Sequence, residues 1–150
     1  MLIRNILEES AHKFDEVKAV KWLNKKEIME RSYGELMENV VSTRKGLLAE
    51  GFEGKHIALI GTSSVEWMES YLGIITGCTT AVPLDAALPC EDLIDLLNRS
   101  DSVALFLSPK LKPYLDAFLA NCPKLQKVWM LQEEVEDAPA KVYGIGELRN

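Results

Sequence analysis

The residues of this chain best suited to chemistry are the small and hydroxylated ones of Gly61-Thr62-Ser63-Ser64. They follow an apolar run over residues 57–60 and precede an amphipathic segment, so they predict a loop between a buried strand and a helix. Because the first backbone N–H groups of a helix have no partners within it, such a loop can hold a phosphate or another anion. Gly61, Thr62, Ser63 and Ser64 are therefore the candidate anion-binding residues.

The same loop also has an explanation that needs no ligand, and we favour it. Ser63 and Glu66 have the spacing of a capping box, in which each side chain accepts a hydrogen bond from the backbone of the other residue. The nearest cation along this strand, Lys55, stands at its opposite end. No positive charge is therefore expected beside the loop.

The cysteines do not have the spacing of a metal site or a catalytic pair. Cys78, Cys90 and Cys122 are odd in number and far apart, which favours reduced thiols in a cytoplasmic protein. Cys90 follows Pro89 near a helix start, but the sequence supplies no histidine to pair with it. We interpret all three as packing or surface residues.

The histidines and paired carboxylates also have structural explanations. His12 lies four residues after Glu8 on a polar helix face, and His56 lies at the start of a strand. Asp92 and Asp95 share a helix face, where negative charge near the first turn favours the helix dipole. The motifs GxGxxG, GxxxxGK[ST], HExxH and CxxC are all missing, so we predict no catalytic residue and no metal ligand.

Composition and charge narrow the class of protein. The 150 residues are 47% hydrophobic and 27% charged, as expected of one ordered globular unit. The net charge is -6 and the lysines are scattered, which argues against a nucleic-acid partner. Glu8 and Glu9 interrupt the apolar N-terminal run, so we expect neither an export signal nor a transmembrane segment.

The first part of the chain predicts a helix, a hairpin and a long second helix. Apolar residues at helical spacing mark a helix over residues 2–14, and extended segments over 17–23 and 27–32 flank a tight connection. Ser32 and Glu35 have the spacing of a capping box that starts the next helix. Gly51 supplies the left-handed residue that ends this helix, and Phe52 can fold back on Leu47.

The middle of the chain alternates strands and helices. We expect strands over 57–60, 79–82, 103–107 and 127–131, the first of them central and the second stopped by Pro83. Helices are expected over 63–77, from Pro89 onward, and over 110–121, with Gly73 packed closely on the sheet. The helix over 63–77 is expected to bury one set of apolar residues: Val65, Met68, Tyr71, Leu72 and Ile75.

This order predicts an α/β fold, a doubly wound and mostly parallel sheet with helices on both faces, because strand–helix–strand crossovers are right-handed. We divide residues 1–150 into a helix and hairpin over 1–32, an α/β sheet core over 33–132 and an irregular tail over 133–150. Residues 144–148 have the pattern of a helix start within that tail.

Several segments together carry a resemblance to a known family. They are Ser32-Tyr33-Gly34-Glu35-Leu36, the loop and helix start over 61–67, and Gly77 followed by Ala81-Val82-Pro83-Leu84-Asp85. In this order they resemble the N-terminal part of AMP-forming acyl-CoA synthetases of the long-chain fatty-acid–CoA ligase type and their adenylate-forming relatives. The resemblance covers about residues 5–132, and Ser64 stands where many relatives have asparagine.

The resemblance implies a parent enzyme that activates a carboxylate with Mg-ATP and then transfers the acyl group from AMP to the thiol of coenzyme A. It implies ATP, Mg²⁺ and CoA as cofactors of the full-length parent and none for this fragment. The phosphate loop and the catalytic lysine of the family have no counterpart between residues 1 and 150. The chain is therefore expected to be a truncated N-terminal scaffold subdomain, inactive alone, whose partner is the remainder of the enzyme.

Two alternatives from other functional classes remain open. The chain could be an independent flavodoxin-like module that binds a ligand at the carboxyl ends of its strands, near residues 61–63 and 82–85. It could also be an interaction protein that self-associates through an apolar surface exposed by truncation.

Overall fold

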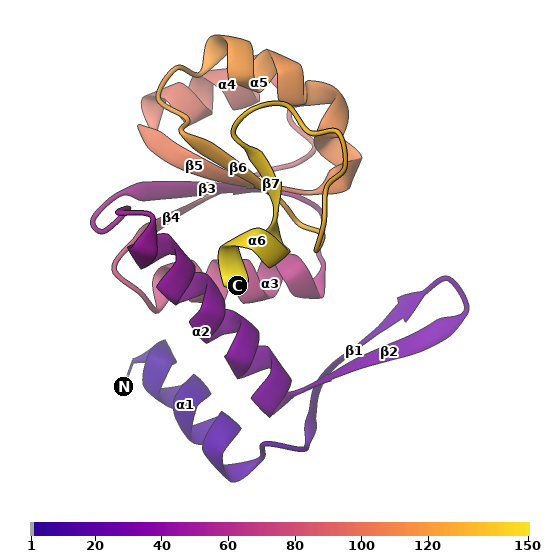
Figure 1. Ribbon diagram of the computed structural model, residues 1–150. Coiled ribbons are helices and arrows are strands. Elements are labelled where there is room, and N and C mark those ends of the chain that lie inside the picture. Colours follow the sequence, from indigo (N-terminus) through magenta and orange to yellow (C-terminus); the bar gives the residue numbers. More distant parts are fainter. Residues whose placement is uncertain (1) are drawn as a thin grey trace.

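A five-stranded parallel sheet in the order β4-β3-β5-β6-β7 forms the centre of the molecule (Figure 1). The structure is a computed structural model and describes residues 2–150, so Met1 lies outside it. The strands are β1 (Lys18–Asn24), β2 (Glu27–Ser32), β3 (His56–Ile60), β4 (Thr80–Leu84), β5 (Ser102–Leu107), β6 (Lys127–Met130) and β7 (Val142–Gly144). The helices are α1 (Ile3–Lys13), α2 (Tyr33–Ala49), α3 (Val65–Ile75), α4 (Cys90–Arg99), the 3-10 helix η1 (Pro109–Tyr114), α5 (Leu115–Asn121) and α6 (Ile145–Arg149).

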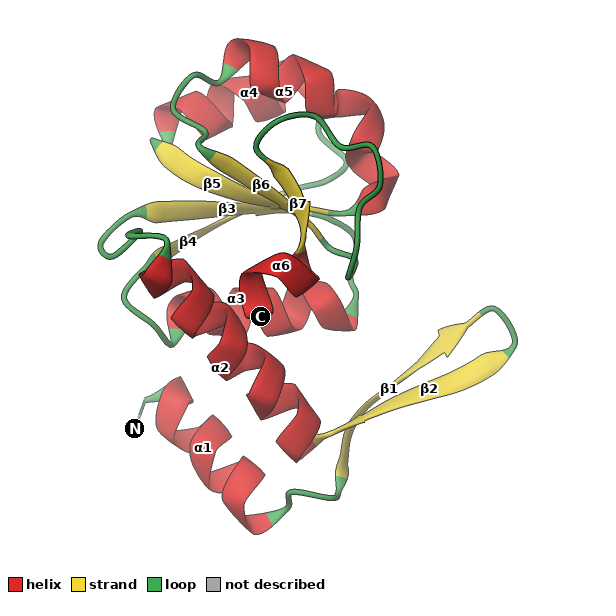
Figure 2. Ribbon diagram, viewed as in Figure 1, coloured by secondary structure: helices red, strands yellow, loops and turns green. Residues whose placement is uncertain are grey.

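Helices cover both faces of this sheet, which confirms the predicted doubly wound α/β fold. Figure 2 shows α4 and α5 above the sheet, and α2, α3 and α6 below it. The antiparallel hairpin β1–β2 projects away from the sheet, and α1 lies beside α2. The predicted N-terminal helix and hairpin are therefore both present.

Helix α2 begins and ends as its sequence predicts. The backbone N–H of Glu35 donates to Ser32 Oγ and that of Ser32 donates to Glu35 Oε2, each at 3.1 Å, which completes the capping box. At the other end Gly51 has a φ of +81°. The N–H of Phe52 donates to the carbonyl of Leu47 at 3.2 Å, as in a Schellman motif.

Two apolar clusters, one on each face of the sheet, hold these layers together. In β3, Ala58 and Ile60 face the cluster under α4 and α5, whereas Ile57 and Leu59 face the cluster above α2 and α3. Such alternation within an unbroken apolar run is what a strand covered on both faces requires. β3 is an interior strand as expected, although β5 takes the middle position.

Three segments differ from the predictions made for them. Pro83 lies inside β4 rather than stopping it; β4 is an edge strand, where a missing N–H costs no hydrogen bond between strands. Residues 109–114 form the 3-10 helix η1 ahead of α5, because Pro113 cannot donate an α-helical hydrogen bond. Part of the expected irregular tail is ordered as β7 and α6, with Val142 paired to Val128 of β6.

Helix α3 is rotated relative to the expected orientation. Its buried residues are Val65, Glu69, Ser70, Gly73 and Ile74, so the expected inward residues Met68, Tyr71, Leu72 and Ile75 are only half-buried. Gly73 packs on α2 and not on the sheet, since a Cβ there would lie 2.7 Å from Thr43 Cβ. The orientation of α3 differs from the expected one because α2 approaches it closely at Gly73, which turns the polar residues Glu69 and Ser70 inward.

None of the helices described between residues 2 and 150 combines the length and the hydropathy that crossing a bilayer requires.

Candidate functional site

A cavity of about 440 Å³ opens at the carboxyl ends of β3 and β4, beside the loop that follows β5. We call it the carboxyl-edge cavity. Open parallel α/β sheets bind their ligands at this edge. Its lining residues are Gly61, Thr62, Ser63, Leu84, Asp85, Ala86, Ala87, Lys110 and Leu111.

The residue that caps α3 is Ser64 and not Ser63, which corrects the predicted capping box. Ser64 Oγ accepts a hydrogen bond from the backbone N–H of Trp67 at 3.1 Å. The helix therefore begins one residue later than expected, and Glu66 lies in its first turn without reaching back to the cap. Ser63 is left to line the carboxyl-edge cavity, while Ser64 is not among its lining residues.

We expect Ser64→Ala to lower the free energy of unfolding by about 1 kcal/mol, because an N-cap hydrogen bond is lost. Ser63→Ala is the matched control and is expected to change it by less than about 0.5 kcal/mol, as for other surface positions. Urea denaturation followed by circular dichroism measures both. The reverse order of effects would show that Ser63 is the cap.

The loop itself is held by a serine from the neighbouring strand end. The backbone N–H of Thr62 donates to Ser108 Oγ at 3.1 Å, and Ser108 is buried. A Cβ at Gly61 would collide with the same hydroxyl, so only glycine fits there. One backbone donor of the candidate anion loop is thus already used within the protein.

The carboxyl-edge cavity has one cation that the sequence analysis missed. Lys110, the second residue of η1, lines it together with Gly61, Thr62 and Ser63. No carboxylate within residues 2–150 lies at ion-pair distance from Lys110. The signal was available, because parallel strands end at the same edge and Lys110 closely follows the strand that neighbours β3.

The charged groups of this cavity are one lysine, Lys110, and one carboxylate, Asp85. Asp85 is the one carboxylate of the lining, and its Oδ1 already accepts the N–H of Ala87 at 2.9 Å. Among the described residues no group of three or more His, Cys, Asp and Glu side chains has the arrangement of a metal site. Anion binding at the loop stays a prediction.

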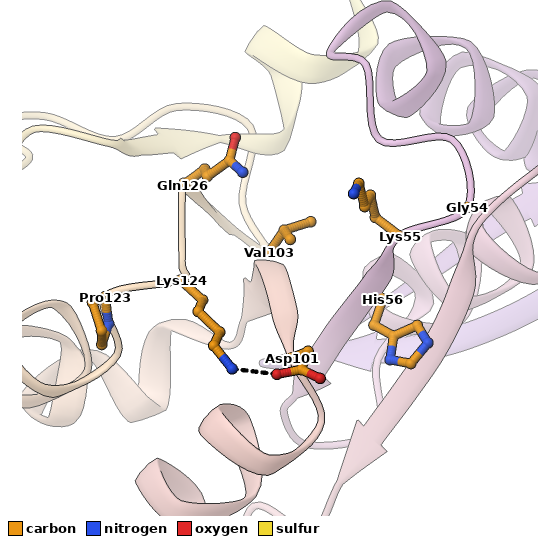
Figure 3. Close-up of a pocket in the computed structure, with 8 residues that line it drawn as sticks. All are labelled: Gly54, Lys55, His56, Asp101, Val103, Pro123, Lys124 and Gln126. Carbon is orange, nitrogen blue, oxygen red and sulfur yellow. Dashed lines mark hydrogen bonds and ion pairs between the residues drawn. The ribbon is translucent and has the colours of Figure 1, made fainter.

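A second cavity, of about 560 Å³, opens at the opposite end of the sheet (Figure 3). There Lys124 forms an ion pair with Asp101, and this hydrogen bond together with the lysine charge lowers the pKa of Asp101. His56 Nδ1 lies 2.7 Å from the carbonyl oxygen of Ser100, to which it can donate. Because this cavity lies at the amino ends of the strands, it is not the expected ligand edge of the fold.

The other reactive side chains are dispersed over the molecule. Cys78 is exposed, Cys90 is half-buried and Cys122 is buried, and burial raises the pKa of the Cys122 thiol. All three are free thiols. Asp92 lies in the first turn of α4 as predicted, and Asp95 pairs with Arg99 at 3.1 Å.

A sequence model of the family described as AMP-binding enzyme matches residues 7–146. The chain belongs to this family. The match includes the whole sheet and every strand that leads into the carboxyl-edge cavity. No curated protein matches the chain in sequence.

Solved structures share the fold of this AMP-binding family member at low sequence identity. Coronafacic acid ligase from Pectobacterium brasiliense is 20% identical with a TM-score of 0.88, over 99% of this chain and 29% of that one. The anthranilate CoA ligase AuaEII in complex with anthranoyl-AMP is 19% identical with a TM-score of 0.75, over 85% of this chain and 24% of that one.

The N-terminal domain of FACL13 from Mycobacterium tuberculosis is also similar, with 20% identity and a TM-score of 0.76 over 85% of this chain and 33% of that one. The chain thus spans between 24% and 33% of the length of these three relatives.

Proposed function

We propose that this chain is the N-terminal scaffold subdomain of an ATP-dependent acid–thiol ligase. In the whole enzyme a carboxylate attacks the α-phosphate of ATP to form an acyl-adenylate and pyrophosphate, and the thiol of CoA then displaces AMP. The observation that carries the proposal is the family match over residues 7–146, supported by the fold shared with ligases. ATP, Mg²⁺ and CoA are the cofactors of that whole enzyme.

The substrate of the parent is a carboxylic acid, and a fatty acid is the class we propose. Two fold neighbours are named for ligases of anthranilate and coronafacic acid, and a third is named as a putative long-chain-fatty-acid CoA ligase. Because these names differ, the proposal rests on the resemblance of the sequence motifs. We place the enzyme in the cytoplasm, which agrees with three free cysteines.

The carboxyl-edge cavity is the part of the chain that faces the ligands in this proposal. It supplies a wall built from the ends of two parallel strands, with Lys110 and Asp85 as its charged groups. One lysine offsets only part of the charge of a triphosphate, and one carboxylate supplies only one of the oxygen ligands of an octahedral Mg²⁺ ion. The remaining groups must come from the rest of the enzyme, which is the principal partner of this subdomain.

Exposed apolar side chains on the hairpin agree with such a partner. Leu23 and Ile28 are 72% and 68% exposed, and they are neighbours across the two strands. We propose that the rest of the enzyme covers this surface, and that the isolated chain self-associates through it.

The chain alone is expected to show no ATP–pyrophosphate exchange with any carboxylate, because the phosphate-binding and metal-binding groups are missing from it. The assay uses labelled pyrophosphate, Mg-ATP and a series of aliphatic and aromatic acids. In parallel, the coding sequence that follows Asn150 is expected to encode a Ser/Thr/Gly-rich loop ending in Pro-Lys. Exchange above the enzyme-free blank would refute the scaffold role.

The same preparation tests the alternative of an independent flavodoxin-like module. The observation that favours this alternative is the carboxyl-edge cavity, whose Lys110 has no carboxylate at ion-pair distance among residues 2–150. A module with its own ligand is stabilised by that ligand, whereas a scaffold subdomain is not. A rise in melting temperature with phosphate or AMP that is lost in Lys110→Gln would favour the module.

A further inference from the structure

A cavity of about 370 Å³ lies between α1, α2 and the loop from α3 to β4, and it shares no lining residue with the carboxyl-edge cavity. We call it the α1–α2 cavity. Its volume is within the range of small-molecule sites. It is lined by Arg4, Val41, Arg44, Lys45, Leu48, Glu53, Gly77, Cys78 and Thr79.

The charges around this cavity leave positive charge in excess. Arg4 Nε and Arg44 Nη1 lie 2.9 Å and 3.9 Å from the same oxygen, Glu8 Oε1, so two guanidinium groups share one carboxylate. Within residues 2–150 no carboxylate lies at ion-pair distance from the Lys45 ammonium group. Glu53 is the one carboxylate of the lining, and Glu8 lies beside it and pairs with Arg4 and Arg44. Three cations are thus set against two carboxylates.

Arg44 is the cation held most firmly at the cavity. Its Nη1 donates to the carbonyl of Thr76 at 3.3 Å, and only 14% of its side chain is exposed. Burial and, after it, the nearby charge of Arg4 lower the pKa of Arg44, and the charge of Glu8 opposes them. Because Glu8 is shared between Arg4 and Arg44 and lies 3.9 Å from Arg44, a further anion beside Arg44 and Lys45 is still favoured.

The other walls are apolar and continue beyond the cavity. Val41 and Leu48 lie seven residues apart on α2, so they stand two turns apart on one face of the helix. Another cavity, of about 540 Å³, adjoins the α1–α2 cavity and shares Arg4 and Gly77 with it. Its further lining residues are Leu2, Ile3, Ile75 and Thr76.

We propose that the α1–α2 cavity binds an amphipathic monoanion, a small carboxylate with a hydrocarbon chain. Arg44 and Lys45 hold the carboxylate, and the hydrocarbon lies over Val41 and Leu48 toward the adjoining cavity. One positive charge in excess matches one negative charge on the ligand. This is a second site, away from the strand ends, and it goes beyond the proposed role of the carboxyl-edge cavity.

Octanoate and 1-octanol provide a matched pair of probes, because they share a hydrocarbon chain and differ in charge. Titration calorimetry with the 150-residue chain is expected to show binding of octanoate and at least about tenfold weaker binding of octanol. Lys45→Gln removes one charge at an exposed position, where the fold tolerates change, and is expected to weaken octanoate binding about tenfold. Arg44→Gln should have at least the same effect.

Lys110→Gln is the control for location, since Lys110 belongs to the carboxyl-edge cavity, and it should leave octanoate binding unchanged. Cys78 reports on the site directly: octanoate should slow its alkylation by uncharged N-ethylmaleimide, with Cys78→Ala giving the background from the other thiols. Equal affinity for octanol, a loss of binding in Lys110→Gln, unprotected Cys78, or no octanoate binding would each overturn the proposal.

Discussion

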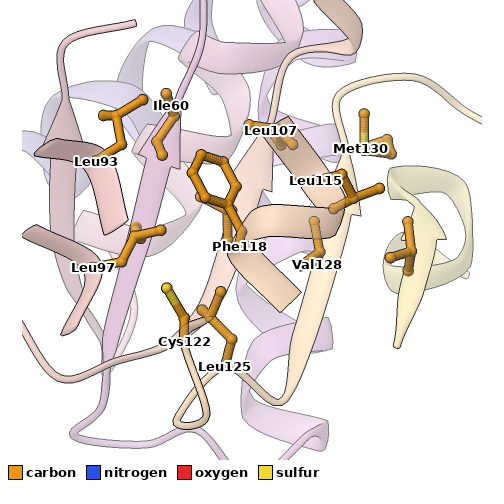
Figure 4. Close-up of a cluster of buried hydrophobic side chains, with 13 residues drawn as sticks. Ile60, Leu93, Leu97, Leu107, Leu115, Phe118, Cys122, Leu125, Val128 and Met130 are labelled. Atoms are coloured by element: carbon orange, nitrogen blue, oxygen red, sulfur yellow. The ribbon is translucent and has the colours of Figure 1, made fainter. Parts of the chain in front are cut away.

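Phe118→Ala is expected to lower the free energy of unfolding by roughly 3–5 kcal/mol, the range for removing an aromatic side chain from a packed core. Phe118 of α5 is fully buried, and Figure 4 shows its ring among side chains of α4 and of the strands. Tyr114 adds an aromatic contact at a ring distance of 6.1 Å. A domain of this size has a net stability of about 5–15 kcal/mol, so the variant is expected to be partly unfolded at 37 °C.

The neighbouring residue provides a control for this prediction. Leu119 is only half-buried at the edge of the same cluster. Leu119→Ala is therefore expected to lower the free energy of unfolding clearly less than Phe118→Ala does, as measured by urea titration of both variants. Equal costs would mean that α5 does not pack on the sheet through the face that carries Phe118.

Arg149→Met is expected to have a similarly large effect, through a buried carboxylate that joins four elements. Glu69 of α3 is fully buried and accepts a hydrogen bond from Asn39 Nδ2 at 2.8 Å. Arg31 Nε of β2 lies 3.2 Å from Glu69 Oε2, and Arg149 Nη1 of α6 lies 3.7 Å from Glu69 Oε1. Arg149 Nε also donates to Thr43 Oγ1 at 2.9 Å.

Removing Arg149 leaves the Glu69 charge buried with one fewer guanidinium group. Breaking a buried ion pair costs about 3–5 kcal/mol, which corresponds to a loss of roughly 6–20 °C in melting temperature for a chain of this length. Arg99→Met is the control, since its pair with Asp95 is exposed and is worth less than about 1 kcal/mol. Equal melting temperatures for Arg149→Met and Arg99→Met would mean that the ion pair between Arg149 and Glu69 does not stabilise the fold.

The loss in free energy of unfolding caused by Arg149→Met is also expected to increase as the pH rises. Burial raises the pKa of Glu69, against the opposing effects of Asn39, Arg31 and Arg149. A carboxyl with a raised pKa keeps its proton in the folded state where the unfolded chain has lost it, so its contribution to stability is present at low pH and is lost as the pH passes its folded pKa. Above that pKa Glu69 is charged and Arg149 neutralises it, so losing Arg149 destabilises the fold. Below that pKa Glu69 is neutral, and the substitution is expected to lower the free energy of unfolding by less. A cost that does not change with pH would contradict the raised pKa.

Local patterns were sufficient to predict most elements of the fold. Capping residues, a left-handed glycine and apolar periodicity depend on neighbours a few residues away, which is why α2 and the hairpin agree with their predictions. Strand β3 was equally clear, since a strand buried on both faces needs an unbroken apolar run.

The errors arose where a contact from a distant part of the chain decides the outcome. Gly73 faces Thr43 of α2, and this close approach turns Glu69 and Ser70 inward on α3, where periodicity had placed apolar residues. Strand β7 is three residues long and forms only because β6 offers it a partner. Neither contact has a local signature in the sequence.

The candidate site divides in the same way. The sequence alone predicted a loop over residues 61–64, because a polar turn between an apolar strand and a helix is a local feature. In the structure Gly61, Thr62 and Ser63 line the cavity, and Ser64 caps α3 instead. The tertiary structure added Lys110, which is 47 residues beyond Ser63 along the chain and lines the same cavity. No local pattern marks it, and it can be inferred only from the order of the strands in the sheet. Parallel pairing brings distant strand ends to one edge of the sheet, and this pairing is set by the packing of the whole domain.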